Sequence, residues 1–492
     1  MRPAPVTSWL LSLPLALALV ACGGGVDDGV VDVAFIAPPS EMATGGLRLA
    51  FAGQHLKAAQ AQGLVALDPA GAVVPAIAER WIVTDDGASY IFRIREFDLP
   101  DGSRLTAQVV RDRLAATLRR LEGTSLGLDL AKVRDIRAMT GRVIEIRLTS
   151  PMPDLLQLLA QPELGLSLDG MQIGPMTARR DGEMLELTAM PPEARGLPSQ
   201  DGWQDMVSPV RVYARDAASA ARGFGEGRFD LVLGGRIESL PLANAGPLSR
   251  GTIRLDAAVG LFGFDVAVPT GFLATAENRE AVALAIDRAA LPGAFNIGGW
   301  VPTTRVVAPG LPGDRSSVNE RWADLDMTAR RARAAARVSA WRSSNGGAAR
   351  VTIGLPDGPG SDLLFEALAE DLAQVGIEAE RADKGTRANL VLRDRVARIA
   401  SPYWFLNQFN CRVSRNVCAE GADYLVGLAV DARDPAEEAS FLAEAELAIT
   451  ATNLYIPLGA PIRWSQVRGD IVGFSENSWN VHPLFPLSRA PI

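Results

Sequence analysis

The chain has 492 residues, of which 48% are hydrophobic, and its formal net charge at neutral pH is −8. A chain of this length exceeds what one hydrophobic core usually organises, so we expect two or more lobes. The acidic balance argues against nucleic acid as a partner and against a basic surface that docks on membranes.

The N-terminus predicts export followed by attachment of a lipid. Residues 9–20 form an apolar run that is too short to span a bilayer and is typical of a signal-peptide core. The run leads into Leu19-Val20-Ala21-Cys22, which resembles the bacterial lipobox, where the cysteine thiol takes a diacylglycerol and becomes the new N-terminus. We therefore expect residues 1–21 to be a cleaved signal peptide, Cys22 to be lipidated and residues 22–30 to be a flexible tether. An ordinary secretory signal with a coincidental cysteine is the alternative.

Strand and helix patterns alternate along the mature part of the chain. Residues 63–81 predict a strand, a turn, a second strand and a short helix, and residues 82–95 predict a hairpin turning at Asp86-Gly87. A helix is expected over about 107–121, with Thr106 as its N-cap. Farther along, the patterns predict strand 142–148, helix 154–160, strand 210–214, helix 217–224, strand 229–233, helix 277–290 ended by Pro292, a β-α-β unit over 351–380 and helix 437–450. Residues 161–206 give no clear pattern. The alternation predicts an α/β chain.

Several short blocks of residues follow one another along the chain. They are Gly63-Leu64, Pro75, Ala78-Glu79-Arg80-Trp81, Asp86-Gly87, Asp101-Gly102, Leu105-Thr106-Ala107, Gly227, Asp230-Leu231, Ala285-Ile286-Asp287-Arg288, Gly376-Ile377 and Tyr455-Ile456-Pro457-Leu458. Together they resemble the extracellular solute-binding family that serves oligopeptide, dipeptide and nickel ABC importers. The resemblance covers about residues 63–480.

The resemblance implies a two-lobed fold of the periplasmic-binding-protein kind, in its large subclass. Lobe I would comprise residues 31–258 plus 456–492, with an extra subdomain over 60–150, and lobe II would comprise residues 262–453. The implied protein is a monomeric substrate-binding lipoprotein without a cofactor, anchored by its lipid in the periplasm. Its partners would be a small-molecule solute and an inner-membrane ABC permease. A non-transport lipoprotein on the same scaffold, acting in sensing or envelope assembly, is the alternative.

One position of the solute site departs from the family pattern. Many relatives that bind peptides place an aspartate in lobe II, where it pairs with the free amine of the ligand. The matching segment here, residues 395–406, places Arg398 at that position. A guanidinium repels an ammonium and prefers a carboxylate or a phosphate. The sequence therefore predicts a solute with an anionic group.

Aromatic residues are few, so their positions suggest where a flat or apolar part of the solute would bind. The predicted ligand-binding residues besides Arg398 are Tyr403, Trp404, Trp300, Trp479 and Asn480. The alternative for residues 403–405 is that they belong to the core.

Catalysis and metal binding find little support in the sequence. Gly123-Thr124-Ser125-Leu126-Gly127 matches a nucleophile elbow, but it follows a helix and only His482 lies downstream as a base. Two histidines cannot supply a histidine-rich metal site, so we expect neither an enzyme nor a metal.

Once Cys22 is assigned to the lipid, Cys411 and Cys418 remain, and an even pair in an exported chain predicts a disulfide. Two free thiols are the alternative, and a zinc site is disfavoured because neither histidine is near in sequence.

Overall fold

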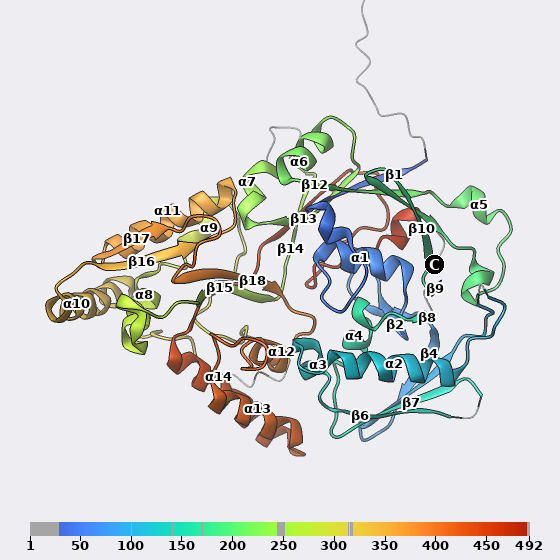
Figure 1. Cartoon of the computed structure of the whole chain (residues 1–492), viewed down its shortest axis with the longest axis horizontal. Coiled ribbons are helices and arrows are strands. Elements are labelled where there is room, and N and C mark those ends of the chain that lie inside the picture. The colour runs from blue at the N-terminus through green and yellow to red at the C-terminus, as the bar shows by residue number, and fades with distance from the viewer. Residues whose placement is uncertain are drawn as a thin grey trace, which may run out of the picture.

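Two central sheets, one in each lobe, organise the chain in the computed structural model (Figure 1). The structure describes residues 29–99, 101–139, 141–168, 171–243, 251–312, 314 and 318–489, with the backbone alone for 171 and 172. The predicted signal peptide, the lipidation site Cys22 and most of the tether lie outside the described residues.

The sheet of lobe I follows the order β10-β11-β12-β1-β13-β20-β14. Its strands are β1 (Val31–Ile36), β10 (Met176–Asp181), β11 (Met184–Ala189), β12 (Val210–Arg215), β13 (Leu231–Arg236), β14 (Ile253–Asp256) and β20 (Arg463–Val467). Side chains of β1 alternate between two buried clusters: Phe35 packs with α1 (Phe51–Gln60), and Ala34 with α6 (Ala217–Gly225). Helices therefore cover both faces of this sheet at its parallel strands β12, β1 and β13, as expected for parallel pairing.

The extra subdomain of lobe I has a four-stranded sheet in the order β4-β5-β7-β6 and a separate hairpin, β2–β3. Its elements are β2 (Val65–Leu67), β3 (Val73–Pro75), β4 (Ala78–Val83), β5 (Ser89–Ile94), α2 (Ala107–Leu121), α3 (Ser125–Asp129), β6 (Val133–Ala138) and β7 (Val143–Leu148), followed by α4 (Leu155–Leu159). Thr106 caps α2 as predicted, because its Oγ1 accepts from the backbone N–H of Val109 at 3.3 Å. The prediction of a short helix before residue 81 is wrong. Strand β4 occupies this segment, because pairing with β5 satisfies its backbone hydrogen-bonding groups.

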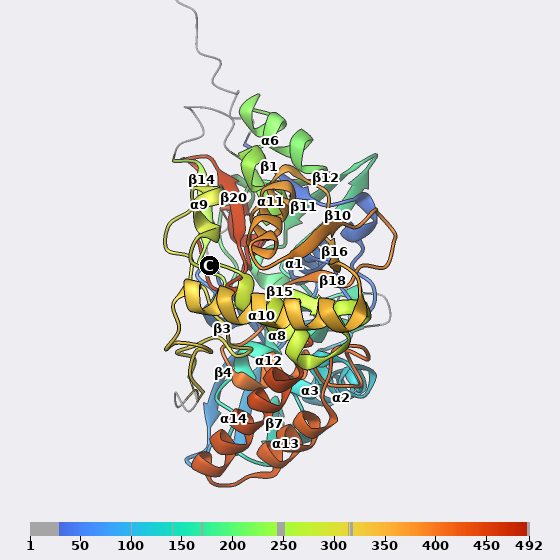
Figure 2. The same cartoon turned by 90° about the vertical axis from the view of Figure 1, so that its left-hand side faces the viewer.

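The sheet of lobe II follows the order β17-β16-β18-β15-β19. Its strands are β15 (Gly260–Val266), β16 (Ala349–Gly354), β17 (Ile377–Arg381), β18 (Leu390–Val396) and β19 (Tyr455–Gly459), and its helices are α8 (Ala276–Ala285), α9 (Leu291–Phe295), α10 (Met327–Asn345), α11 (Pro359–Ala373), α12 (Pro402–Asn407), α13 (Glu420–Asp431) and α14 (Pro435–Thr452). Figure 2 views this lobe from its outer side, with α13 and α14 below its sheet. Pro292 opens α9 instead of ending α8, because the first turn of a helix does not need the missing N–H.

Two short segments connect the lobes. The first is 257–259, between β14 and β15, and the second is 460–462, between β19 and β20. The second lies later than the expected lobe boundary at 456, because β19 pairs with β15 and so belongs to the sheet of lobe II. We call 257–259 and 460–462 the crossover segments.

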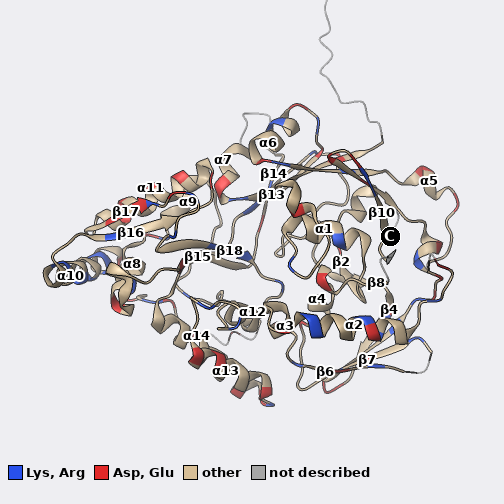
Figure 3. Ribbon diagram, viewed as in Figure 1, with Lys and Arg blue, Asp and Glu red and all other residues tan. Residues whose placement is uncertain are grey.

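Three further observations concern the chain as a whole. Cys411 and Cys418 are joined by a disulfide in the loop between α12 and α13, with their Cα atoms 5.1 Å apart. Basic and acidic residues are interspersed along both lobes (Figure 3). Within the described ranges, every helix is too short or too polar to cross a membrane.

Candidate solute-binding site

Polar side chains from the two lobes meet where α3 and the 3-10 helix η2 (Pro162–Leu164) approach the start of α12. Arg398 of lobe II reaches across: its Nη2 lies 3.5 Å from Oε1 of Glu163, and its Nη1 donates to Oγ of Ser125 at 3.3 Å. The Arg398 side chain is 24% exposed, whereas that of Glu163 is 2% exposed. Arg398 therefore lies between the lobes and already has a carboxylate partner, and its role in binding a solute stays a prediction.

Two other polar pairs join the lobes nearby. Nδ2 of Asn407 donates to Oδ1 of Asp129 at 2.8 Å, and Nζ of Lys132 lies 2.8 Å from Oε1 of Glu438. Burial raises the pKa of Asp129 to about 6, against the opposing effects of the Asn407 hydrogen bond and the Arg398 charge. Oδ2 of Asp129 and Oε2 of Glu163 are buried without a hydrogen-bond partner among the described residues. The contact between the lobes thus contains acceptors that are not used.

A cavity of about 60 Å³ lies beside this contact, and both lobes line it. We call it the interlobe cavity. Its polar and charged lining consists of Asp129, Lys132, Asp154, Ser401, Tyr403 and Glu438. Nζ of Lys132 lies 5.0 Å from the ring centre of Tyr403, and burial, with the nearby charge of Glu438, raises the pKa of this tyrosine.

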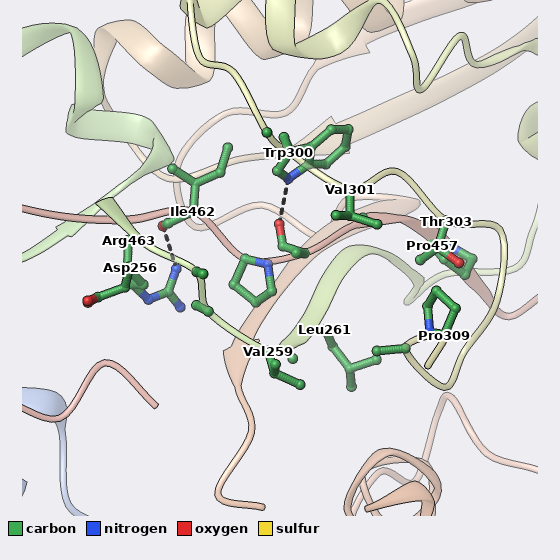
Figure 4. A pocket seen from close by; sticks show the side chains of 18 of the residues that line it. Asp256, Val259, Leu261, Trp300, Val301, Thr303, Pro309, Pro457, Ile462 and Arg463 are labelled. Carbon is green, nitrogen blue, oxygen red and sulfur yellow. Dashed lines mark hydrogen bonds between the residues drawn. The ribbon is translucent and has the colours of Figure 1, made fainter. Parts of the chain in front are cut away.

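A second cavity, of about 340 Å³, lies at the crossover segments, and we call it the crossover cavity (Figure 4). Its apolar lining includes Leu255, Val259, Leu261, Trp300, Val301, Pro309 and Ile462. The polar side chains at its margin are engaged elsewhere: Nη1 of Arg463 donates to Oδ2 of Asp394 at 2.9 Å, and Oγ1 of Thr303 donates to Oε1 of Glu320 at 2.6 Å. The crossover cavity therefore suits a flat or apolar group rather than a charged one.

Two of the aromatic residues that were predicted to bind the ligand, Trp300 and Trp404, have different environments. Trp300 lines the crossover cavity, and its Nε1 donates to the backbone oxygen of Ala460 at 2.7 Å, which holds the ring against the crossover segment (Figure 4). Trp404 is only 2% exposed, and its ring packs edge-on against Phe405 with the ring centres 5.0 Å apart. The expectation that Trp404 offers a stacking surface is therefore not met, because α12 turns the ring into the core.

Trp479 and Asn480 lie near the C-terminus, apart from the lining of both cavities. Trp479 packs on the β2–β3 turn so closely that a Cβ added at Gly71 would lie 2.5 Å from its Cδ1. Asn480 is buried and has a left-handed backbone conformation, with φ of 51°. The packing of Trp479 against Gly71 attaches the C-terminal segment to the β2–β3 turn.

The residues of the apparent nucleophile elbow do not form a catalytic arrangement. Ser125 is the first residue of α3, which follows α2 with only a short turn between them, and its hydroxyl accepts from Arg398. His482 instead lies 3.1 Å from Asp256 (Nε2 to Oδ2), at the end of β14. No group of three or more metal-ligating side chains is found in the part of the chain that the structure describes.

Sequence reasoning missed the lobe I side of the interlobe contact. Glu163 lies in the stretch that gave no clear pattern. Asp129 ends α3 and Lys132 follows it, and the Gly-x-Ser-x-Gly match just before them indicates catalysis and not a contact between lobes. Their importance arises only from the approach of lobe II, so no local signal in the sequence marks them.

The fold is that of the two-lobed periplasmic binding proteins, as comparison with solved structures shows. No protein-family model and no curated protein matches the sequence. The structure of Haemophilus influenzae OppA in complex with the peptide RPPGFSPFR matches with a TM-score of 0.77 at 14% identity, over 94% of this chain and 98% of that one. The Escherichia coli murein tripeptide binding protein MppA matches with a TM-score of 0.75 at 14% identity, over 92% and 97%. Brucella suis NikA in complex with Fe(III)-EDTA matches with a TM-score of 0.71 at 15% identity, over 93% and 99%.

Proposed function

We propose that this chain is the substrate-binding lipoprotein of an ABC importer of the oligopeptide, dipeptide and nickel class. It captures a small solute between its two lobes in the periplasm and presents the solute to an inner-membrane permease. Two lobes joined by two short crossover segments support this proposal, because such an arrangement can close like a hinge over a ligand and exclude water from it.

The observation that carries the proposal is the position of Arg398 between the lobes. Its guanidinium is partly exposed and contacts lobe I through Glu163 and Ser125. A solute with a carboxylate or phosphate could take over one face of this guanidinium, and a charge-assisted hydrogen bond there would contribute about 1.5–3 kcal/mol. The apolar crossover cavity, with Trp300 in its lining, would suit the flat or apolar body of such a solute.

The ligands of the similar structures differ in chemistry, so they do not identify the proposed solute. One of those structures holds a nonapeptide and another holds Fe(III)-EDTA, so the fold accommodates ligands of different chemistry. For this chain we propose a small organic solute, peptide-like or not, that carries an anionic group.

The test is to identify what the protein carries in its own host. The mature protein, purified natively and then denatured, should release a stoichiometric solute that mass spectrometry detects. The same solute, added back, should reduce the radius of gyration measured by small-angle X-ray scattering. A protein that releases nothing and keeps one radius of gyration across host extracts and candidate solutes would contradict the proposal.

A specific observation favours the alternative, a sensing or assembly lipoprotein on the same scaffold. The pairs Arg398–Glu163, Asn407–Asp129 and Lys132–Glu438 connect the lobes directly. Spin labels at the exposed positions Met139→Cys and Tyr424→Cys, one on each lobe, would report the distance between the lobes in a Cys22→Ser background. Two distances that interconvert with solute support transport, whereas one fixed distance supports the alternative.

A further inference from the structure

The interlobe cavity has an excess of negative charge. Three carboxylates line it, those of Asp129, Asp154 and Glu438, and the cation in its lining is Lys132. Nζ of Lys132 lies 2.8 Å from Glu438, so these two charges offset each other. The charge of Arg398 also acts on Asp129, and that of Lys132 on Asp154, but the lining itself has one cation against three carboxylates.

One carboxylate oxygen of Asp129 has no hydrogen-bond partner among the described residues. Its side chain is buried, with 4% of the residue exposed, and Oδ1 accepts from Asn407. Oδ2 is buried without a partner among the described residues, and Asp129 belongs to the lining of the interlobe cavity. A buried carboxylate oxygen without a donor is costly, so the natural occupant of this cavity is a group that donates hydrogen bonds.

The volume and the surrounding oxygens define what kind of donor fits. About 60 Å³ holds an ammonium group or a few water molecules but not a whole solute. A primary ammonium has three N–H donors. Asp129, Ser401 and Tyr403 line the cavity and have oxygens that can accept them, and Oδ2 of Asp129 and the hydroxyl of Tyr403 are buried without a hydrogen-bond partner among the described residues. Because no three metal-ligating side chains converge among the described residues, this set of groups suits an N–H cation better than a coordinated metal.

We propose that the interlobe cavity receives the primary ammonium group of the transported solute, with Asp129 of lobe I as its counter-ion. This inference rests on the proposed function and narrows it: with Arg398 beside the same contact, the solute carries an amino group as well as an anionic group. The recognising carboxylate comes from lobe I, whereas lobe II contributes the hydroxyls that close over the ammonium.

Methylammonium is the probe for this cavity. Thermal unfolding of the full mature protein is followed during titration with methylammonium chloride, with sodium chloride to hold ionic strength constant. We expect a saturable rise in the melting temperature of the wild type and an apparent affinity about 10- to 100-fold weaker in Asp129→Asn. Tetramethylammonium, which has no N–H and is too large, should give no saturable rise.

Each variant replaces an aspartate with an asparagine, which removes one charge with almost no change in side-chain size. Asparagine at position 129 keeps the oxygen that accepts from Asn407, and Asp85→Asn, on an exposed turn, removes one charge elsewhere as the control. If Asp129→Asn does not fold, Asp154→Asn takes its place and should also weaken methylammonium. Equal titrations of the wild type, the cavity variant and the control would show that the cavity holds water alone and would overturn the inference.

The chemistry of the solute released from the native protein distinguishes a failure of this inference from a failure of the proposed function on which it rests. A released solute with a primary amine supports both. A released solute without an amine overturns the inference and leaves the proposed function standing. A protein that binds methylammonium at Asp129 but neither releases a solute nor changes its radius of gyration keeps the ammonium site and overturns the proposed function.

Discussion

Nη2 of Arg398 in lobe II lies 3.5 Å from Oε1 of Glu163 in lobe I. The two side chains belong to separately packed lobes, so their pairing depends on how far the lobes are closed. Since the carboxylate of Glu163 is almost fully buried, separation of the lobes would remove the guanidinium from it and expose it to water. The pair therefore couples the proposed solute site to the closure of the protein.

Arg398→Asp should weaken binding of the anionic solute that co-purifies with the protein. Removing a charge-assisted hydrogen bond and adding a like charge beside Glu163 should reduce the affinity about 10- to 100-fold, as measured by isothermal titration calorimetry. Cationic solutes should bind the variant better than the wild type. Arg104→Asp, at an exposed position of lobe I, is the control and should leave the affinity unchanged. Equal affinities of all three proteins would exclude Arg398 from the site.

Cys22→Ser should release the protein from membranes. The sequence before Cys22 predicts lipid attachment at this thiol, and a serine cannot form the thioether. The wild type should partition into the detergent phase and show the mass of an acylated N-terminus, while the variant should remain in the aqueous phase. A variant that still partitions with membranes, beside a wild type without an acyl mass, would contradict the lipobox.

The loop between α12 and α13 should lose stability when its cysteines are replaced. Closing a loop with a sequence separation of 7 residues contributes about 2–3 kcal/mol in the chain-entropy model. The double variant Cys411→Ser, Cys418→Ser should lower the free energy of unfolding by about this amount in urea titrations. Thiol counting on the denatured, non-reduced wild type should find neither cysteine free, and two reactive thiols would refute the disulfide.

His55 should make the protein less stable as the pH falls from 8 to 5. Burial lowers the pKa of His55 from 6.5 to about 3, and the ring is held neutral because Nε2 accepts from the backbone N–H of His482 at 3.0 Å. Below pH 6.5 the unfolded chain binds a proton that the folded chain does not, so this contribution is present above pH 6.5 and is lost as the pH falls.

The comparison with His55→Gln isolates this contribution, because other groups titrate in the same range. Between pH 8 and pH 5 the wild type should lose about 1–2 kcal/mol more of its free energy of unfolding than the variant. Urea titrations at each pH measure the difference. Parallel pH profiles for the two proteins would show that His55 takes up its proton in the folded state.

The sequence alone determined the elements whose signals are local. Thr106 and the apolar spacing after it predicted α2 correctly, and Asp86-Gly87 predicted the turn between β4 and β5, because a cap and a turn depend on residues within a few positions. The order of the motif blocks predicted the two-lobed α/β fold. Where pairing with a neighbouring strand determines the structure, the local pattern gave a wrong prediction. The segment before residue 81 is strand β4 and not a helix, and β19 lies in lobe II because it pairs with β15.

Only the tertiary structure decided which side chains meet between the lobes. The segment around Arg398 marks this residue in the sequence, but its partners Glu163 and Ser125 come from the other lobe. No motif surrounds Glu163, and the Gly-x-Ser-x-Gly match around Ser125 indicates a nucleophile and not a partner for Arg398. Likewise Trp404 follows Tyr403 directly, yet its ring is buried while Tyr403 borders the interlobe cavity, because α12 points successive side chains in different directions. Periodicity and capping act along the chain, whereas a site between two lobes depends on how two separately folded cores are placed against each other.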